Sequence, residues 1–126
     1  MASEGRTADA RRAALRLGAS AEDRVVEQLE AEGWRILARN WRGGGGELDV
    51  VALRDGRLRM VEVKARDPGD PLGPLESVTR AKQRRLRGAA EAWLLTAQVP
   101  DHDEVCFLVA TVVDGRVELY DDPFAV

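Results

Sequence analysis

Cysteine and histidine are almost absent from this chain, which has one of each, Cys106 and His102, in 126 residues. A single cysteine excludes an internal disulfide and fits a reducing compartment. The two residues are too few for a structural zinc site, and nothing around His102 forms a Ser-His-Asp or Cys-His catalytic group. The chemistry of this protein must therefore be sought among other side chains.

Long apolar runs are also missing. The Ala- and Leu-containing run 13–19 is interrupted by Arg16, and no stretch is typical of a signal peptide or long enough to cross a membrane. We expect a cytoplasmic protein without a membrane partner. With 44% hydrophobic and 33% charged residues, the chain should form one domain over residues 1–126, with flexible ends at 1–6 and 122–126.

Positive charge is not in excess overall, since the formal net charge is −3. The charge is segregated, however. Residues 1–97 carry 18 basic and 15 acidic side chains, a net of +3, whereas residues 98–126 carry 1 basic and 7 acidic, a net of −6. A polyanion meets local patches rather than the total charge, so the composition leaves a nucleic-acid partner open.

Apolar periodicity and turn residues predict seven elements in the order α-β-β-β-α-β-β. The expected helices cover residues 7–32 and 75–95, and the expected strands cover 33–40, 47–53, 58–65, 104–113 and 116–120. Asp55-Gly56 and Asp114-Gly115 are typical two-residue hairpin turns. Because a long connection containing a helix precedes the apolar fourth strand, we expect an α/β fold with a mixed sheet flanked by helices.

The hairpin of residues 47–65 carries charged residues where apolar ones are ordinary. A two-residue turn at Asp55-Gly56 predicts the following cross-strand pairs on one face: Leu53–Leu58, Val51–Met60, Asp49–Glu62 and Glu47–Lys64. Like charges in direct opposition destabilise a sheet, and a divalent cation between Asp49 and Glu62 removes that conflict. Ligands that are all oxygen suit Mg²⁺ or Mn²⁺. Lys64, two residues after Glu62, is then placed to stabilise charge on an attacked phosphate.

A structural interpretation of the same hairpin stays open on spacing alone. Glu47 and Lys64 can form an exposed cross-strand salt bridge, while Asp49 and Glu62 lie at a solvated sheet edge.

One charged residue interrupts the apolar stripe of each helix. Glu22 lies three and four residues before Val25 and Val26, at the edge of the core-facing stripe of the first helix. Lys82 interrupts a similar stripe in the second helix. The functional interpretation of Lys82 is a lysine near the scissile phosphate, and the alternative is a lysine that extends past its neighbours to water.

The longer string "GELDVVALRDGRLRMVEVKAR" resembles the central motif of the YraN family, small bacterial proteins with a restriction-endonuclease-like fold. That family is similar to archaeal Holliday-junction resolvases and to the wider PD-(D/E)xK nuclease superfamily. The resemblance covers residues 17–95 and includes "EGWRILARNWR" and "TRAKQRRLRGAAEAWL". It implies a metal-dependent nuclease.

The resemblance also implies roles for individual residues. Asp49, Glu62 and the backbone carbonyl of Val63 match the metal ligands, Lys64 matches the catalytic lysine, and Glu22 matches the glutamate of the first helix that completes the acidic cluster. The usual Gly-Glu of that helix is Ala21-Glu22 here, and an aspartate on the late strand is not matched in "CFLVATVV".

Basic and aromatic residues around this motif are candidates for nucleic-acid contacts. They are Arg39, Trp41, Arg42, Arg66, Arg80, Lys82, Arg84 and Arg87. The glycines at 43–46 let a backbone approach a ligand closely, whereas Trp41 can instead cap the core and the arginines can form a solvated face.

The sequence therefore predicts a Mg²⁺- or Mn²⁺-dependent nuclease acting on DNA, including branched or structured DNA, which can work as a homodimer. The alternative is a non-catalytic nucleic-acid-binding module on the same fold. A protein–protein adaptor that uses the acidic C-terminal segment is a third interpretation, with no motif behind it.

Overall fold

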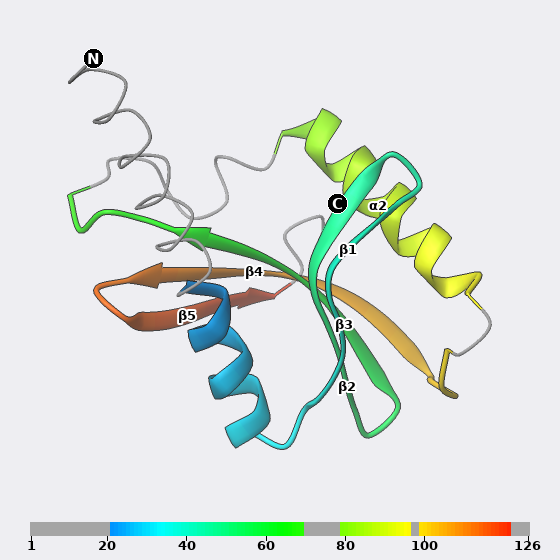
Figure 1. Cartoon of the computed structure of the whole chain (residues 1–126), viewed down its shortest axis with the longest axis horizontal. Helices are drawn as coiled ribbons and strands as arrows, with labels where there is room; N and C mark the ends of the chain where they lie inside the picture. Colours follow the sequence, from blue (N-terminus) through cyan, green and yellow to red (C-terminus); the bar gives the residue numbers. More distant parts are fainter. Residues whose placement is uncertain (1–20, 70–78, 97–98, 122–126) are drawn as a thin grey trace, which may run out of the picture.

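The computed structural model describes residues 21–69, 79–96 and 99–121 (Figure 1). Within these ranges the chain forms a first helix at residues 21–31 and the following elements: β1 (Arg35–Gly43), β2 (Gly46–Arg54), β3 (Arg57–Ala65), α2 (Arg80–Leu94), β4 (Glu104–Val113) and β5 (Arg116–Asp121). This order confirms the predicted α-β-β-β-α-β-β. Residues 7–20 of the first predicted helix, the start of the second helix at 75–78 and both expected flexible ends lie outside the described residues.

The five strands form one mixed sheet in the order β1-β2-β3-β4-β5. All neighbours are antiparallel except β3 and β4, which run parallel. The connection between these two contains α2, because parallel neighbours require a crossover. The mixed sheet inferred from the apolar fourth strand is thus confirmed, and that strand is buried from Leu108 to Val112.

Both Asp-Gly turns have the backbone geometry that their sequence predicts. Asp55 and Gly56 have φ of 48° and 78°, and Asp114 and Gly115 have 49° and 75°. Two successive residues with positive φ make a type I′ turn, whose twist matches that of the flanking strands. The first turn sets the predicted pairs Leu53–Leu58 and Val51–Met60.

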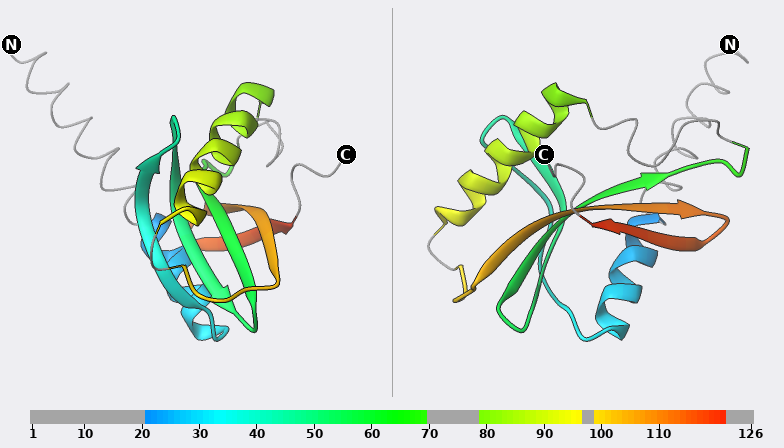
Figure 2. Two further views of the ribbon diagram at one scale, coloured as in Figure 1. Left: turned by 90° about the vertical axis from the view of Figure 1, so that its right-hand side faces the viewer. Right: turned by 180° about the vertical axis from the view of Figure 1, so that it is seen from behind.

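The two helices cover opposite faces of the twisted sheet (Figure 2). Val25 and Leu29 of the first helix pack on a cluster that includes Val50 and Val61. Helix α2 packs on the other face, over the cluster Leu48, Val51, Leu58, Met60, Ala89, Ala90 and Trp93. No helix in the described ranges is long and apolar enough to cross a membrane.

The alternation of faces is interrupted at Asp49. Leu48 belongs to the cluster under α2 and Val50 to the cluster under the first helix, although residues two apart in a regular strand share a face. Between Trp41, which pairs with Leu48, and Arg39, which pairs with Val50, β1 contains Asn40 with a φ of 50°. This left-handed residue twists the ribbon and leaves Asp49 between the two faces.

The predicted register is wrong beyond this point. The ladder between β2 and β3 ends at Val50–Val61, so Asp49 does not pair with Glu62, nor Glu47 with Lys64. From there β3 continues beside β4, with Glu62 opposite Val109 and Lys64 opposite Thr111, while β2 continues beside β1. The hairpin therefore opens into a fork, because β2 stays paired with β1 while β3 stays paired with β4.

Candidate functional site

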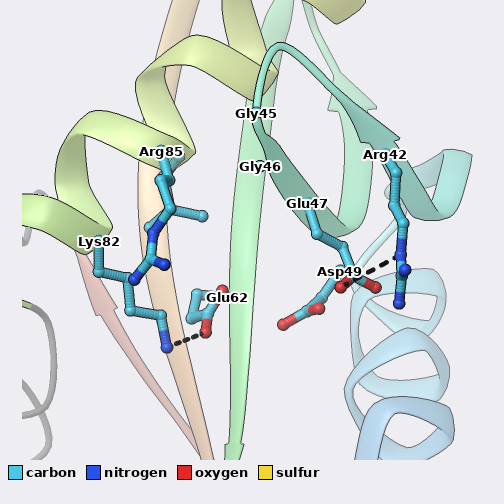
Figure 3. A pocket seen from close by; sticks show the side chains of 9 residues that line it. Arg42, Gly45, Gly46, Glu47, Asp49, Glu62, Lys82 and Arg85 are labelled. Carbon is cyan, nitrogen blue, oxygen red and sulfur yellow. Dashed lines mark ion pairs between the residues drawn. The ribbon is translucent and has the colours of Figure 1, made fainter.

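A pocket of about 470 Å³ lies where the fork opens, between the tip of the β1–β2 hairpin and α2 (Figure 3). Lys82 and Arg85 extend into it from α2, while Glu47, Asp49 and Arg42 come from the hairpin and Glu62 from β3. Gly45, Gly46 and Leu86 complete the wall. Acidic and basic side chains thus meet in one hollow.

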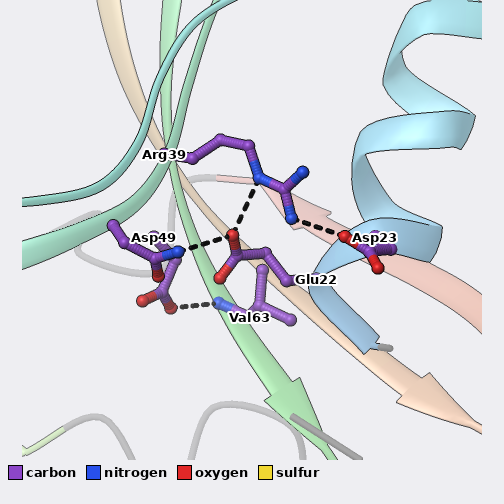
Figure 4. A network of polar contacts seen from close by, with 6 residues as sticks. Glu22, Asp23, Arg39, Asp49 and Val63 are labelled. Carbon is purple, nitrogen blue, oxygen red and sulfur yellow. Dashed lines mark hydrogen bonds and ion pairs between the residues drawn. The ribbon is translucent and has the colours of Figure 1, made fainter. Parts of the chain in front are cut away.

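Beyond Val50 and Val61, the side chain of Asp49 replaces the backbone as the hydrogen-bond partner of β3. Its Oδ2 accepts a hydrogen bond of 2.8 Å from the backbone N–H of Val63 (Figure 4). Burial and the negative charge of Glu62 nevertheless raise the pKa of the Asp49 carboxyl from 3.8 to about 7, and the bond from Val63 opposes this rise only in part. The predicted repulsion between Asp49 and Glu62 is therefore present without direct pairing.

Glu62 is buried and is held by two lysines. Its Oε1 lies 2.6 Å from Nζ of Lys82 and 3.5 Å from Nζ of Lys64. These are the only two lysines of the sequence, and its other 17 basic residues are arginines (19 − 2 = 17). Both lysines of the sequence therefore contact the same carboxylate oxygen.

The two lysines differ in how firmly they hold their protons. Burial, together with the neighbouring Lys82, lowers the pKa of Lys64 despite the attraction of Glu62. Burial also disfavours charge on Lys82, but its hydrogen bonds to Glu62 and Lys64 outweigh that and raise its pKa. Of the pair, Lys64 is the lysine that loses its proton more readily.

Glu22 is buried on the first helix, on the far side of Asp49 from α2. Its Oε1 accepts hydrogen bonds from Nε of Arg39 at 2.9 Å and from Nδ2 of Asn40 at 3.1 Å (Figure 4). Arg39 also binds Oδ1 of Asp23 at 2.6 Å. The left-handed backbone of Asn40 thus brings two consecutive side chains of β1 onto one carboxylate.

The three predicted acids are close but not assembled into a ready metal cage. The contacts described engage Oε1 of Glu22, Oδ2 of Asp49 and Oε1 of Glu62. Among the described residues, no three Asp, Glu, His or Cys side chains are grouped closely enough to hold a metal ion. A cation would therefore need a second oxygen from these acids, backbone carbonyls or water.

Gly44 and Gly46 serve the packing of α2. A Cβ on Gly44 would lie 2.1 Å from the carbonyl oxygen of Gly88, and one on Gly46 would lie 2.2 Å from that of Arg85. The hairpin tip, with φ of 59° at Gly44 and 81° at Gly45, lies directly on the helix backbone. A glycine within a helix, here Gly88, often has such a packing reason, and the sequence interpretation did not use it.

The residues predicted to bind nucleic acid lie at several different places in the structure. Arg80, Arg84 and Arg87 are exposed on α2, and Lys82 lines the pocket. Arg42 lies at the pocket with 81% of its side chain exposed, 3.7 Å from Glu47. Arg66 follows β3, and its backbone N–H donates to the carbonyl of Val112.

Two of the residues predicted to contact nucleic acid have partners within the protein. Arg39 is bound by Glu22 and Asp23. Trp41 is half-buried against the α2 cluster, and its ring covers Gly43 so closely that a Cβ there would lie 2.4 Å from it. Capping of the core, the alternative interpretation of Trp41, agrees with this position. Arg85, which lines the pocket, was not among the predicted residues.

Sequence comparisons place the chain among known proteins. The profile of "Uncharacterised protein family UPF0102" matches residues 21–113. A UPF0102 protein of Rhodopseudomonas palustris is 46% identical over 93 residues, 74% of this chain and 68% of the relative. Relatives in Roseiflexus castenholzii and Lachnoclostridium phytofermentans are 41% and 35% identical, covering 69% and 85% of this chain and 70% and 91% of the relatives. The chain belongs to the UPF0102 family.

Proposed function

We propose that the protein is a metal-dependent nuclease that hydrolyses phosphodiester bonds in DNA, including branched or structured DNA. The observation that carries the proposal is the pocket lined by Asp49, Glu62 and Lys82, with Nζ of Lys64 3.5 Å from Oε1 of Glu62. Two acids whose charges oppose each other, next to two lysines, suit a cation and a phosphate in adjacent positions. The resemblance to the YraN family and to PD-(D/E)xK nucleases points to the same chemistry.

The donor atoms fit Mg²⁺ or Mn²⁺. Asp49, Glu62, the carbonyl of Val63 and, from the opposite side, Glu22 offer oxygen ligands only, as these ions prefer. The raised pKa of Asp49 arises from burial and from Glu62, and a cation relieves both. When bound, such an ion polarises the phosphate and lowers the pKa of a coordinated water.

The two lysines at Glu62 have different roles in this proposal. Lys82 keeps its proton and is oriented by Glu62, so it is suited to neutralising a phosphate oxygen as charge develops there. Lys64, with its lowered pKa, is suited to taking a proton from an attacking water. The same two side chains hold Glu62 in place before any substrate binds.

Cleavage assays test the proposal directly. Linear, nicked, flapped and four-way DNA and single-stranded RNA are incubated with the protein in Mn²⁺, Mg²⁺ or EDTA. We expect metal-dependent cleavage that Asp49→Asn abolishes and that Asp101→Asn, an exposed loop variant, leaves intact. Cleavage that persists in Asp49→Asn, or absence of cleavage with every substrate, contradicts the catalytic claim.

A non-catalytic nucleic-acid-binding module is the second candidate. It is favoured by the ion pair of 2.6 Å that already engages Glu62 and by the lack of a ready three-ligand group among the described residues. It predicts binding in EDTA that weakens steeply with salt and that depends on the exposed Arg84 and Arg87 of α2. Binding without cleavage by the wild type would favour this candidate.

Assembly and location complete the proposal. A four-way junction has two symmetric cleavage positions, so action on junctions implies a homodimer, and light scattering with and without DNA tests this. We infer a cytoplasmic location from the single cysteine.

A further inference from the structure

Arg85 differs from the other basic residues that line the pocket. Lys82 is bound to Glu62 at 2.6 Å, and Arg42 lies 3.7 Å from Glu47. Among the described residues Arg85 has no carboxylate within ion-pair distance, although it lines the same pocket as Asp49 and Glu62. A guanidinium without an internal partner beside a pair of acids is available for an external anion.

The backbone around Arg85 is held in place by the hairpin. A Cβ on Gly46 would lie 2.2 Å from the carbonyl oxygen of Arg85 and 3.3 Å from its Cβ. Helical side chains lean toward the helix N-terminus, so Arg85 leans toward the turn that carries Lys82. In Figure 3 both side chains run from α2 toward Glu62. The contact with Gly46 thus fixes the backbone position from which the side chain of Arg85 enters the pocket.

We propose that Arg85 is a substrate-binding residue that holds a backbone phosphate of a nucleic-acid strand in this pocket. The planar guanidinium donates two parallel N–H bonds to phosphate oxygens, a geometry that an ammonium group lacks. Lys82 then binds the phosphate next to Glu62, and Arg85 binds the neighbouring phosphate of the strand. The inference rests on the proposed function for the identity of the anion, and it adds a residue that neither the motif nor the family resemblance assigns.

Binding measured in EDTA tests the assignment without cleavage. Fluorescence anisotropy with a labelled single-stranded DNA compares the wild type with Arg85→Gln, Arg85→Lys and Arg116→Gln. Arg116 is the matched control, because it carries the same charge, is exposed and lies on β5 outside the pocket. Melting curves confirm that each variant is folded.

We expect Arg85→Gln to weaken binding about tenfold, the effect of losing a charge-assisted hydrogen bond. The slope of log affinity against log salt should fall by about 0.7, the value for one phosphate of a single strand. Arg85→Lys should retain the slope but recover only part of the affinity. Arg116→Gln should have a clearly smaller effect on affinity than Arg85→Gln.

Three results would overturn the assignment. They are an equal or larger loss for Arg116→Gln, full affinity in Arg85→Gln, and no binding by the wild type. Inorganic phosphate is added as a competitor. If a low concentration of phosphate displaces the DNA, the ligand of Arg85 is free phosphate rather than a strand. If the wild type cleaves no substrate, or Asp49→Asn cleaves as well as the wild type, while Arg85→Gln still weakens binding, the nuclease proposal fails and the phosphate site stands.

Discussion

Lys82 of α2 and Glu62 of β3 are joined by an ion pair of 2.6 Å between Nζ and Oε1. This pair links the helix to the strand at the bottom of the pocket, and Lys64 approaches the same oxygen at 3.5 Å. The two lysines therefore partly neutralise the negative charge of Glu62. Asp49 remains the acid whose pKa is raised. We expect the balance between these four charges to govern what the pocket binds.

Removal of the Lys82 charge should tighten metal binding. A unit charge near a divalent cation opposes it by at least about 1 kcal/mol in a partly hydrated site, so Lys82→Met should raise Mn²⁺ affinity about fivefold or more, measured by titration calorimetry. Arg80→Met removes one charge from an exposed position of the same helix and serves as the control. Weaker Mn²⁺ binding in Lys82→Met would show that the lysine supports the metal site instead of competing with it.

A metal that binds the native state should raise the melting temperature. At a hundredfold excess over Kd, binding stabilises by about 2.7 kcal/mol, roughly 5 °C or more for a domain of this size. Asp49→Asn should lose most of this rise and should melt higher than the wild type without metal, because it removes one of two opposed charges. A wild type that does not respond to Mn²⁺ or Mg²⁺ at millimolar concentration contradicts the metal site.

The raised pKa of Asp49 predicts a pH dependence in EDTA. Its folded-state pKa of about 7 exceeds the ordinary value of 3.8, so the native state holds a proton that the unfolded chain has lost. Between these two values stability must fall as pH rises, because the native state binds more protons. Its contribution is complete below pH 3.8 and is lost above about 7.

Denaturant unfolding of the wild type and Asp49→Asn at several pH values measures this contribution. The difference in unfolding free energy between the two proteins should change across the window from about pH 4 to 7, with the wild type becoming relatively less stable as pH rises. A difference that is independent of pH would mean that Asp49 ionises normally.

Gly88 should be intolerant of a side chain. Gly→Ala inside a helix ordinarily stabilises by about 1 kcal/mol, but here the new Cβ would lie 2.6 Å from the carbonyl oxygen of Gly44. We expect Gly88→Ala to lower the free energy of unfolding by about 1–3 kcal/mol, as overpacking does. Gly69→Ala, where no atom lies within 4 Å, should be nearly neutral. Stabilisation by Gly88→Ala would contradict the close backbone contact.

Arg39 should affect stability more than nucleic-acid binding. Arg39→Gln withdraws the charged donor from Glu22, which is only 8% exposed, and this should cost about 1–3 kcal/mol of unfolding free energy. Asp23→Asn breaks only the exposed pair and should cost less than about 1 kcal/mol. If Arg39→Gln is neutral for stability but weakens DNA binding, the original prediction of a nucleic-acid contact is the correct one.

Turn chemistry and apolar periodicity determined the element order. Asp55-Gly56 and Asp114-Gly115 favour positive φ through their own side chains, so the hairpin turns and the pairs Leu53–Leu58 and Val51–Met60 followed from the sequence. The run 104–113 was apolar on both faces, and it became β4 with the same bounds. These features depend on neighbours close in the chain.

Only the tertiary structure decided how the site is assembled. The β2–β3 ladder ends before Asp49 because β3 pairs with the distant β4, and Asn40 adopts a left-handed backbone that no local pattern specifies. Gly44 and Gly46 contact α2, and Lys82 reaches Glu62, across a separation of many residues. The sequence identified the acids and Lys64, but long-range packing determines their partners, because a side chain binds the groups that the fold brings near it.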